Sequence, residues 1–326
     1  MRRLCLSSSL LLLSACTPST PEPPPEPPPP PPYVFPSSPL CTGTYAGTPT
    51  VLGQLGDARL IEISGVVPSP TTPDLLWVHN DSGDDAAIYA IHRDGRQRGR
   101  LRLPVVVDDV EDIDIATCPD KSGPCIYLAD TGNNAGDRTD TAIFIFAEPL
   151  PRADGTFADD AVINAVQRID ASTTAGLPAG IDIEAMAVLP DGETVLLIEK
   201  VDADVARVFA LTAPLSSSVA SEVGSVRTES PAGVRNARMV TGAVAHPSGL
   251  ALLVRTYTGI FESRFASVDD TVSPGDLTMT TVTFGPFSEP QGEAVSYDED
   301  GAGILSISEA NGGAAADIAV NLLACQ

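Results

Sequence analysis

The sequence predicts an all-β protein, and three observations support this fold class. Few segments repeat their apolar residues with the period of a helix. Short runs of alternating or β-branched residues are frequent instead, and turns rich in Gly, Pro, Asp and Asn separate them. Five of these segments share one layout, in which a small or acidic residue precedes an apolar strand, a turn and a second apolar strand. We therefore expect one domain of repeated antiparallel sheets.

The repeated segments predict a single β-propeller, with five blades as the simplest interpretation. They begin at Ser64, Glu111, Glu184, Thr241 and Glu293, at intervals of 47, 73, 57 and 52 residues. Each interval is long enough for four strands, which is the content of one blade. A six-bladed propeller is the alternative, because the interval of 73 residues has room for another blade.

The first residues predict a lipoprotein signal peptide, residues 1–15. Two arginines precede the apolar run 10–13, and the run is too short to span a membrane. The segment 13–16, Leu-Ser-Ala-Cys, resembles the lipobox of bacterial lipoproteins, in which the cysteine becomes the acylated first residue. By that resemblance Cys16 anchors the chain to a lipid bilayer of the cell envelope, at the outer membrane or the cell surface. An ordinary secretory signal with a coincidental cysteine is the alternative.

Residues 16–40 form a proline-rich linker that includes the unbroken run Pro27–Pro32. Proline cannot continue a helix or a strand ladder, so we expect a stalk without packed structure, extended as polyproline. At about 3.1 Å per residue, the residues Pro18 to Pro32 would span roughly 45 Å. The predicted propeller domain then comprises residues 41–326.

The charge balance is strongly acidic, with 43 Asp and Glu against 19 Lys and Arg. This disfavours nucleic acid and anionic lipid as direct partners. An acidic balance is compatible with calcium ligation, and equally with a solvated surface that keeps a monomer soluble.

Four cysteines remain in the predicted domain, and an even number in an exported chain indicates two disulfides. Of the three possible connectivities we favour Cys118 with Cys125, across a short turn, and Cys41 with Cys325, which would join the two ends of a closed circular fold.

The five residues that open the repeats predict a metal site. The first strand of each blade lines the central channel, so Ser64, Glu111, Glu184, Thr241 and Glu293 would face one another. Three converging carboxylates repel unless a hard cation neutralises them, and oxygen-only ligands suit Ca²⁺ better than Zn²⁺. The alternative is structural: each glutamate accepts backbone N–H bonds or holds channel waters.

The ends of the second strands predict a ligand-binding mouth, because antiparallel pairing returns them to the same rim. Lys200 and Arg255 would offer two cations there, which favours an anionic ligand such as a phosphate or an acidic sugar. Alternatively, both cations pair with rim carboxylates such as Glu199, Glu309 and Asp130. The candidate ligand-binding residues are His79, Asn80, Asp81, Asp130, Asn134, Glu199, Lys200, Arg255, Tyr257 and Glu309.

Other prominent residues have structural interpretations. Trp77 is expected to pack between blades. The acidic run 108–112 could hold a metal by itself, but we expect a solvated loop that leads into Glu111. His92 and His246 are expected in surface turns.

Several strings resemble a family of uncharacterised secreted bacterial propeller proteins. They are His-Asn-Asp-Ser-Gly-Asp at 79–84, Glu-Asp-Ile at 111–113, Ala-Asp-Thr-Gly-Asn-Asn at 129–134, Arg-Thr-Tyr-Thr at 255–258 and Pro-Gln-Gly-Glu-Ala at 290–294. The resemblance covers most of the domain and implies a propeller without an assigned activity.

A more distant resemblance is to the calcium-activated nucleotidases, or apyrases, which are five-bladed propellers with calcium in the central channel. Their ring runs Ser, Glu, Glu, Ser, Glu, and the five residues that open the repeats match that order, with Thr241 in place of a serine. The resemblance implies architecture and Ca²⁺ more than nucleotide hydrolysis.

We therefore expect a calcium-stabilised envelope propeller that binds an anionic small molecule, a glycan or a protein at the channel mouth. The alternative is a calcium-dependent hydrolase of phosphate esters or nucleotides. In that case Asp81 or Glu199 would activate water, and Lys200 and Arg255 would stabilise developing charge. The chain lacks the common hydrolase motifs, so the sequence leaves its enzymatic status open.

Overall fold

The computed structural model describes residues 31–229, 237–284, 289 and 291–326. Residues 32–326 form one compact unit. The predicted signal peptide, Cys16 and most of the proline-rich linker lie outside the described residues. Within the described ranges, no helix has the length and apolar character needed to cross a membrane.

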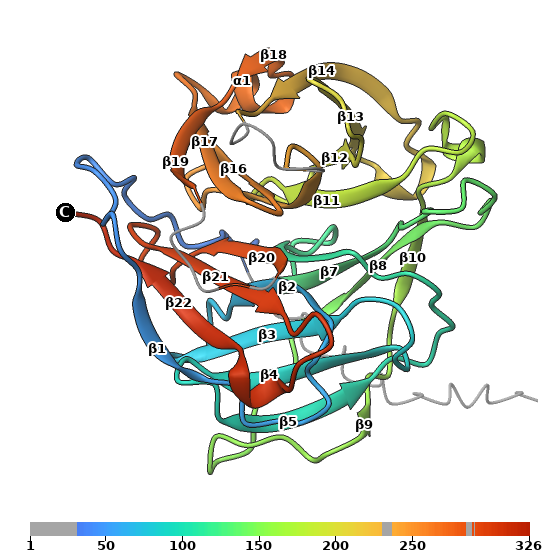
Figure 1. Cartoon of the computed structure of the whole chain (residues 1–326). Helices are drawn as coiled ribbons and strands as arrows, with labels where there is room; N and C mark the ends of the chain where they lie inside the picture. The colour runs from blue at the N-terminus through green and yellow to red at the C-terminus, as the bar shows by residue number, and fades with distance from the viewer. Residues whose placement is uncertain (1–30, 230–236, 285–288, 290) are drawn as a thin grey trace, which may run out of the picture. The chain divides into compact units, whose positions relative to one another are not determined.

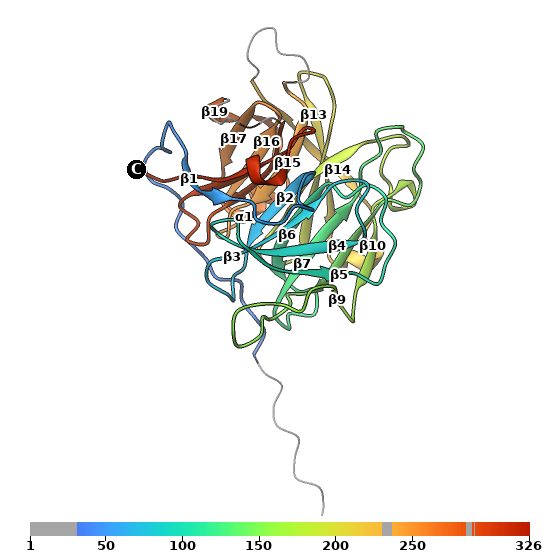
Figure 2. The ribbon, with the colours of Figure 1, turned by 60° about the horizontal axis from the view of Figure 1, so that its bottom comes forward.

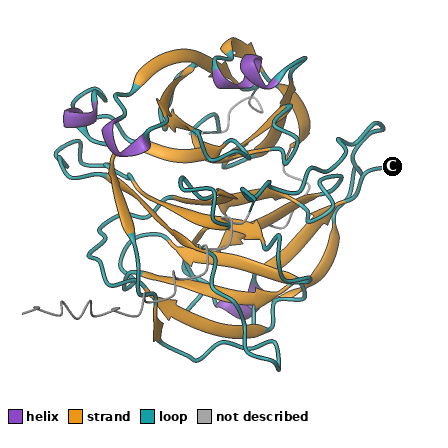
Figure 3. Ribbon diagram, turned by 180° about the vertical axis from the view of Figure 1, so that it is seen from behind, coloured by secondary structure: helices purple, strands orange, loops and turns teal. Residues whose placement is uncertain are grey.

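The all-β fold class and the five blades are confirmed. Strands dominate the ribbon, and the helices are single short turns (Figure 3). Blades one and two contain β2 (Ile63–Pro68), β3 (Leu75–Asn80), β4 (Ala87–His92) and β5 (Gln97–Arg102), then β6 (Asp112–Thr117), β7 (Pro124–Asp130), β8 (Ala142–Ala147) and β10 (Gln167–Asp170).

The third and fourth blades follow in the same order along the chain (Figure 1). They contain β11 (Ile183–Val188), β12 (Thr194–Glu199), β13 (Ala206–Thr212) and β14 (Ser221–Arg227), then β15 (Val240–Ala245), β16 (Ala251–Thr256), β17 (Gly259–Arg264) and β19 (Thr280–Phe284). The helix α1 (Val268–Val272) precedes β19, and three 3₁₀ turns, Thr173–Ala175, Leu215–Ser217 and Ala315–Asp317, lie in loops.

The fifth blade joins the two ends of the propeller. Its strands are β20 (Gln291–Tyr297), β21 (Ile304–Glu309), β22 (Ala319–Leu323) and the first strand of the chain, β1 (Thr50–Gln54). β1 pairs antiparallel with β22, and the two lie side by side in both ribbon views (Figures 1 and 2). The last sheet is therefore completed by the N-terminal part of the domain.

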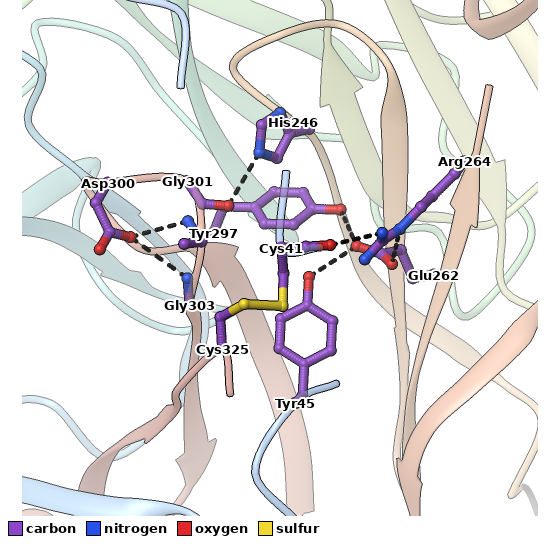
Figure 4. The surroundings of a disulfide bond; sticks show 11 residues. Cys41, Tyr45, His246, Glu262, Arg264, Tyr297, Asp300, Gly301, Gly303 and Cys325 are labelled. Atoms are coloured by element: carbon purple, nitrogen blue, oxygen red, sulfur yellow. Dashed lines mark hydrogen bonds and ion pairs between the residues drawn. A yellow bond between two sulfur atoms is a disulfide. The ribbon is translucent and has the colours of Figure 1, made fainter. Parts of the chain in front are cut away.

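Both predicted disulfides are present. Cys41 bonds to Cys325 across 284 residues, and Cys118 bonds to Cys125 across the β6–β7 turn. Beside the first bond, Glu262 accepts hydrogen bonds from the hydroxyls of Tyr45 (2.8 Å) and Tyr297 (3.0 Å) (Figure 4). The disulfide and this network join the N-terminal segment to blades four and five.

The long interval after Glu111 does not hold a sixth blade. It holds the edge strand β10 of blade two and the short strand β9 (Ala161–Val162), which pairs in parallel with β5 of blade one. β18 (Gly275–Thr278) covers the edge of blade three in the same way, by pairing with β14. Both additions cover an otherwise open sheet edge.

The core consists of five apolar clusters, one at each interface between neighbouring blades. Trp77 is fully buried in the cluster between blades one and two, as predicted, and its Nε1 donates to Glu148 Oε1 at 3.0 Å. His246 contradicts the expectation of a surface turn: it is buried, packs edge-on against Tyr297 and contacts Gly301 O at 2.9 Å.

The inner strands β2, β6, β11, β15 and β20 contact one another in a closed ring around the channel. Asp112 on β6 bridges three of them: its carboxylate accepts the backbone N–H groups of Ile113, Met186 on β11 and Ala243 on β15. Asp114 similarly accepts those of Ile115 and Val188. These two buried carboxylates therefore satisfy N–H groups on the channel side of strands that have no ladder partner there.

Candidate functional site

The five residues that open the repeats occupy equivalent places in the inner strands. In four blades the ladder between the first and second strand shifts by one residue at this position, which is a β-bulge. A bulge redirects a side chain and is common beside functional sites. The residue without a partner in the ladder is Ser64 in blade one, Glu184 in blade three, Thr241 in blade four and Glu293 in blade five. In blade two, Glu111 directly precedes β6.

The two hydroxyl side chains of this ring join neighbouring blades. Ser64 Oγ donates to the backbone carbonyl of Glu111 at 2.6 Å. Thr241 Oγ1 donates to the carbonyl of Gly292 at 3.0 Å. Both side chains are buried, so their first role in the structure is to hold blade one to blade two and blade four to blade five.

The three glutamates of the ring are also buried, but their environments differ. Glu184 Oε1 accepts a hydrogen bond from Lys200 Nζ at 2.6 Å, and Glu293 Oε1 accepts one from Gln291 Nε2 at 2.9 Å. Glu111 Oε1 and Glu293 Oε2 are buried atoms that have no hydrogen-bond partner among the described residues. A buried acceptor without a donor is costly unless a proton or a cation satisfies it.

Three carboxylates from blades one and two converge on a single point. Asp81 follows β3, Asp109 and Glu111 precede β6, and one oxygen from each lies within 4.8 Å of the other two. Asp81 Oδ1 is a further buried oxygen without a partner in the described part of the chain. We call Asp81, Asp109, Glu111, Glu184, Glu293 and Glu309 together the acidic mouth.

Burial and mutual repulsion shift the pKa values of these groups upward. Burial, followed by the charges of Asp109, Glu184 and Glu309, raises the pKa of Asp81 to about 8. Burial raises the pKa of Glu184 to about 7, although Lys200 opposes this shift. The pKa values of Glu111 and Glu293 are raised for the same reason, burial first and then the neighbouring carboxylates. Within the described residues, the acidic mouth thus holds more negative than positive charge, since Lys200 pairs with only one of its carboxylates, Glu184.

The loop before β6 is held in place by Asp130 at the end of β7. Asp130 Oδ1 accepts the N–H groups of Asp108 and Asp109 and pairs with Arg138 at 3.0 Å. Gly132 completes the arrangement, because a Cβ at this position would overlap Glu111 Oε1 and Asp109 Oδ2. The expectation of a solvated loop at 108–112 is therefore wrong for Asp109, which is half-buried, and for Asp112, which is fully buried.

The two predicted cations are both paired, with partners that the sequence did not indicate. Lys200 binds Glu184 and lies 5.7 Å from the centre of the Tyr257 ring. Arg255 is buried between blades four and five, where it pairs with Glu289 at 2.5 Å and donates to Ser306. Lys200 and Tyr257 thus border the acidic mouth, whereas Arg255 is a link between blades.

The remaining ligand-binding candidates divide into two groups. Glu309 lies in the acidic mouth: Gln291 donates to it at 2.7 Å, and burial raises its pKa to about 7. Asn134 is exposed beside Asp109, with which it shares a hydrogen bond. The other candidates contact neighbouring protein groups. The His79 ring contacts the backbone carbonyl of Asn80, and the Asn80 amide donates to Arg59 O and to Asp84. Glu199 pairs with Arg207, and Asp130 holds the loop before β6.

Sequence reasoning missed Asp109, a member of the acidic mouth, and Gln291, which donates hydrogen bonds to two of its members. Asp109 belongs to the acidic run 108–112, and the density of carboxylates in that run is a sequence feature that indicates a possible metal site. Gln291 lies two residues before Glu293 on β20 and bridges Glu293 and Glu309. Nothing in its own residue type distinguishes it from a surface glutamine.

Comparisons with known proteins assign no family. No family model and no curated protein matches the chain. Among solved structures, a chain of the mitotic checkpoint complex is 13% identical over 78% of this chain, with a TM-score of 0.36. A Bacteroides uniformis protein assigned by name to the 6-phosphogluconolactonases is 16% identical over 74%, with a TM-score of 0.38. This chain spans 62% and 63% of those two chains. At such low values neither structure carries an inference about activity.

Proposed function

We propose that the acidic mouth binds one Ca²⁺ ion, held by Asp81, Asp109 and Glu111, and that this ion helps the propeller to bind an anionic ligand. The observation that supports it most is the meeting of three carboxylate oxygens within 4.8 Å of one another. Two oxygens that bind the same Ca²⁺ at 2.3–2.6 Å can be at most about 5 Å apart, so the spacing fits.

The unpaired oxygens support the same proposal. Asp81 Oδ1 and Glu111 Oε1 are buried and lack donors within the described ranges. A cation would satisfy both atoms and would offset the burial and the neighbouring negative charges that raise the pKa values of Asp81 and Glu111. The donor set consists of oxygens alone, which favours Ca²⁺ over Zn²⁺.

Three protein carboxylates leave part of the coordination shell of Ca²⁺ open, since this ion takes six to eight oxygens. Water or an anionic ligand would complete it. Lys200 and Asn134 lie at the border of the mouth and would contact such a ligand. The ligand class is then an anionic small molecule, an acidic glycan or an acidic protein segment, bound at the cell envelope if Cys16 carries the predicted lipid.

A second candidate is calcium-dependent hydrolysis of a phosphate ester. It is favoured by the pKa values of Asp81, Glu184 and Glu309, which lie near neutrality, where a general acid or base works best. Arg255 no longer supports it, because this side chain is buried against Glu289. Turnover of nucleotides or p-nitrophenyl phosphate by the calcium-loaded protein would select this candidate.

Titration calorimetry with Ca²⁺ on the chelator-treated protein tests the proposal. We expect one site per chain in the parent, and its loss in the double variant Asp81→Asn with Asp109→Asn. The matched control is Asp120→Asn with Asp191→Asn, two exposed turn aspartates, which should bind like the parent. An absence of binding in the parent, or equal binding in both double variants, would contradict the proposed site.

A further inference from the structure

A cavity of about 380 Å³ lies where the five inner strands end. β2, β6, β11, β15 and β20 all contribute to its wall, through residues such as Val67, Ile115, Val188, Val244 and Tyr297. The inner strands begin at the acidic mouth, so this distal cavity lies at the other end of the same strands. Its volume falls within the range of small-molecule sites.

The wall of the distal cavity is mainly apolar. Val67, Ile115, Val188 and Val244 are joined there by Pro68 at the end of β2 and by Pro190 and Pro247 from the turns after β11 and β15. Phe35 and Ser38, from the segment that precedes the first strand, add a further side. The apolar part of the wall favours a ligand with an apolar body.

The charged residues of the wall all have the same sign. Among the described residues, the cavity is lined by Asp114, Asp298, Glu299 and Asp300, and by no Lys, Arg or His. Arg93, whose side chain is not part of the wall, pairs with Asp298 at 2.8 Å and with Glu299 at 4.0 Å. Four carboxylates against one cation leave an excess of negative charge around an apolar space.

Asp114 is the most deeply buried of these carboxylates. Each of its oxygens accepts one backbone N–H, from Ile115 and from Val188, both at 2.7 Å. A carboxylate oxygen can accept a second hydrogen bond. Within the described residues no cation pairs with Asp114, and burial raises its pKa to about 8 against those two hydrogen bonds. A positively charged ligand beside Asp114 would favour the ionised carboxylate and would lower this pKa.

We propose that the distal cavity binds a small organic ammonium ion, with its apolar body against the Val and Pro wall and its charged nitrogen toward Asp114 or the rim carboxylates. This site is independent of the calcium site proposed above, because it shares none of its residues. An anionic ligand would meet four carboxylates, and a neutral one would leave Asp114 and Asp300, which Arg93 does not pair with, without a cationic partner.

Three probes of similar size and different charge test the proposal by calorimetry: 2-phenylethylamine, 2-phenylethanol and phenylacetate. We expect the amine to bind at one site per chain, the alcohol at least tenfold more weakly, and the acid not at all. Equal binding of amine and alcohol, or no heat from the amine, would overturn the proposal.

Variants then locate the site. Asp114→Asn should weaken binding of the amine at least tenfold and leave binding of the alcohol unchanged. Because Asp114 is buried, its replacement could prevent folding, so a second variant is needed. Glu299→Gln with Asp300→Asn alters two exposed rim residues and should weaken binding of the amine several-fold. Ala245→Phe should fill the cavity and abolish binding of both probes. Unchanged amine binding in all folded variants would show that the amine binds elsewhere and would refute the site.

Discussion

The two ends of the channel differ in chemistry although the same five strands form both. At the start of the inner strands the wall is acidic, with buried oxygens that lack donors. At the end of those strands, Val, Pro and Ala side chains form most of the wall of a cavity that four carboxylates also line. The inner strands all run in the same direction, so a residue type repeated at one strand position collects at one end. The residue types that recur at equivalent positions of the five strands are therefore grouped at one end of the channel or the other.

Asp112 lies between the two ends and belongs to neither. Its carboxylate bonds to backbone groups of three blades, and nothing of it faces a ligand space. The contrast predicts that carboxylates of the channel fall into three kinds: those that bind a cation, those that hold the blades, and those that attract an ammonium group.

The largest effect is expected from Asp112→Ala, which would leave the N–H groups of Met186 and Ala243 buried without acceptors. At about 1–3 kcal/mol for each unsatisfied group, we expect a loss of about 2–6 kcal/mol in the free energy of unfolding. Urea denaturation measures it. Asp191→Ala, in an exposed turn, should cost under about 1 kcal/mol. A loss this small for Asp112→Ala would show that the bridge does not hold the blades.

We expect the free energy of unfolding to depend on both pH and Ca²⁺ concentration, because the acidic mouth binds either protons or the cation. The folded-state pKa of Asp81, about 8, lies above its unfolded value, so the folded state binds the proton more tightly. Stability without calcium should therefore fall as pH rises from about 4 to 8. Added Ca²⁺ should reverse the loss, by about 2.7 kcal/mol at a hundred times its dissociation constant.

Thermal unfolding at pH 5, 6, 7 and 8, with EDTA or with Ca²⁺, measures this linkage. Mg²⁺ at the same ionic strength is the control for screening. A midpoint that rises with pH in EDTA, or one that does not respond to Ca²⁺ at pH 8, would contradict the arrangement of charges.

Gly132→Ala tests whether the acidic mouth and the distal cavity bind their ligands independently. The added methyl group would displace the Glu111 side chain, so calcium affinity should fall at least about tenfold, or about 1.4 kcal/mol. Amine binding in the distal cavity should not change. Gly123→Ala is the matched control, since a Cβ there would meet nothing. If Gly132→Ala weakened both calcium binding and amine binding, the two ends of the channel would be coupled.

The smallest effect is expected at Lys200, whose charge opposes a nearby cation. Lys200→Met should increase calcium affinity about three- to tenfold at pH 9, which is above the pKa of Asp81. Lys121→Met, at the only other lysine of the chain, should leave the affinity unchanged. A lower affinity in Lys200→Met would indicate that Lys200 organises Glu184 for binding.

The repeated layout sufficed to predict the blades, because each begins with the same small or acidic residue and the same turn chemistry. The disulfides could be predicted from the even number of cysteines, from the expectation that the chain is exported, and from the positions of Cys118 and Cys125 around a short turn. The partners of Arg255 and Lys200 could not be predicted, since Glu289 lies 34 residues after Arg255 and meets it only in the folded blades. The distal cavity was equally hidden, because Val and Pro residues at strand ends are indistinguishable in sequence from core.

A crystal structure of the protein grown with Ca²⁺ is the most direct test of the proposed cation site in the acidic mouth. We expect one anomalous difference peak, about 2.3–2.6 Å from oxygens of Asp81, Asp109 and Glu111. An ordered mouth without such a peak, at calcium concentrations that saturate ordinary protein sites, would contradict it.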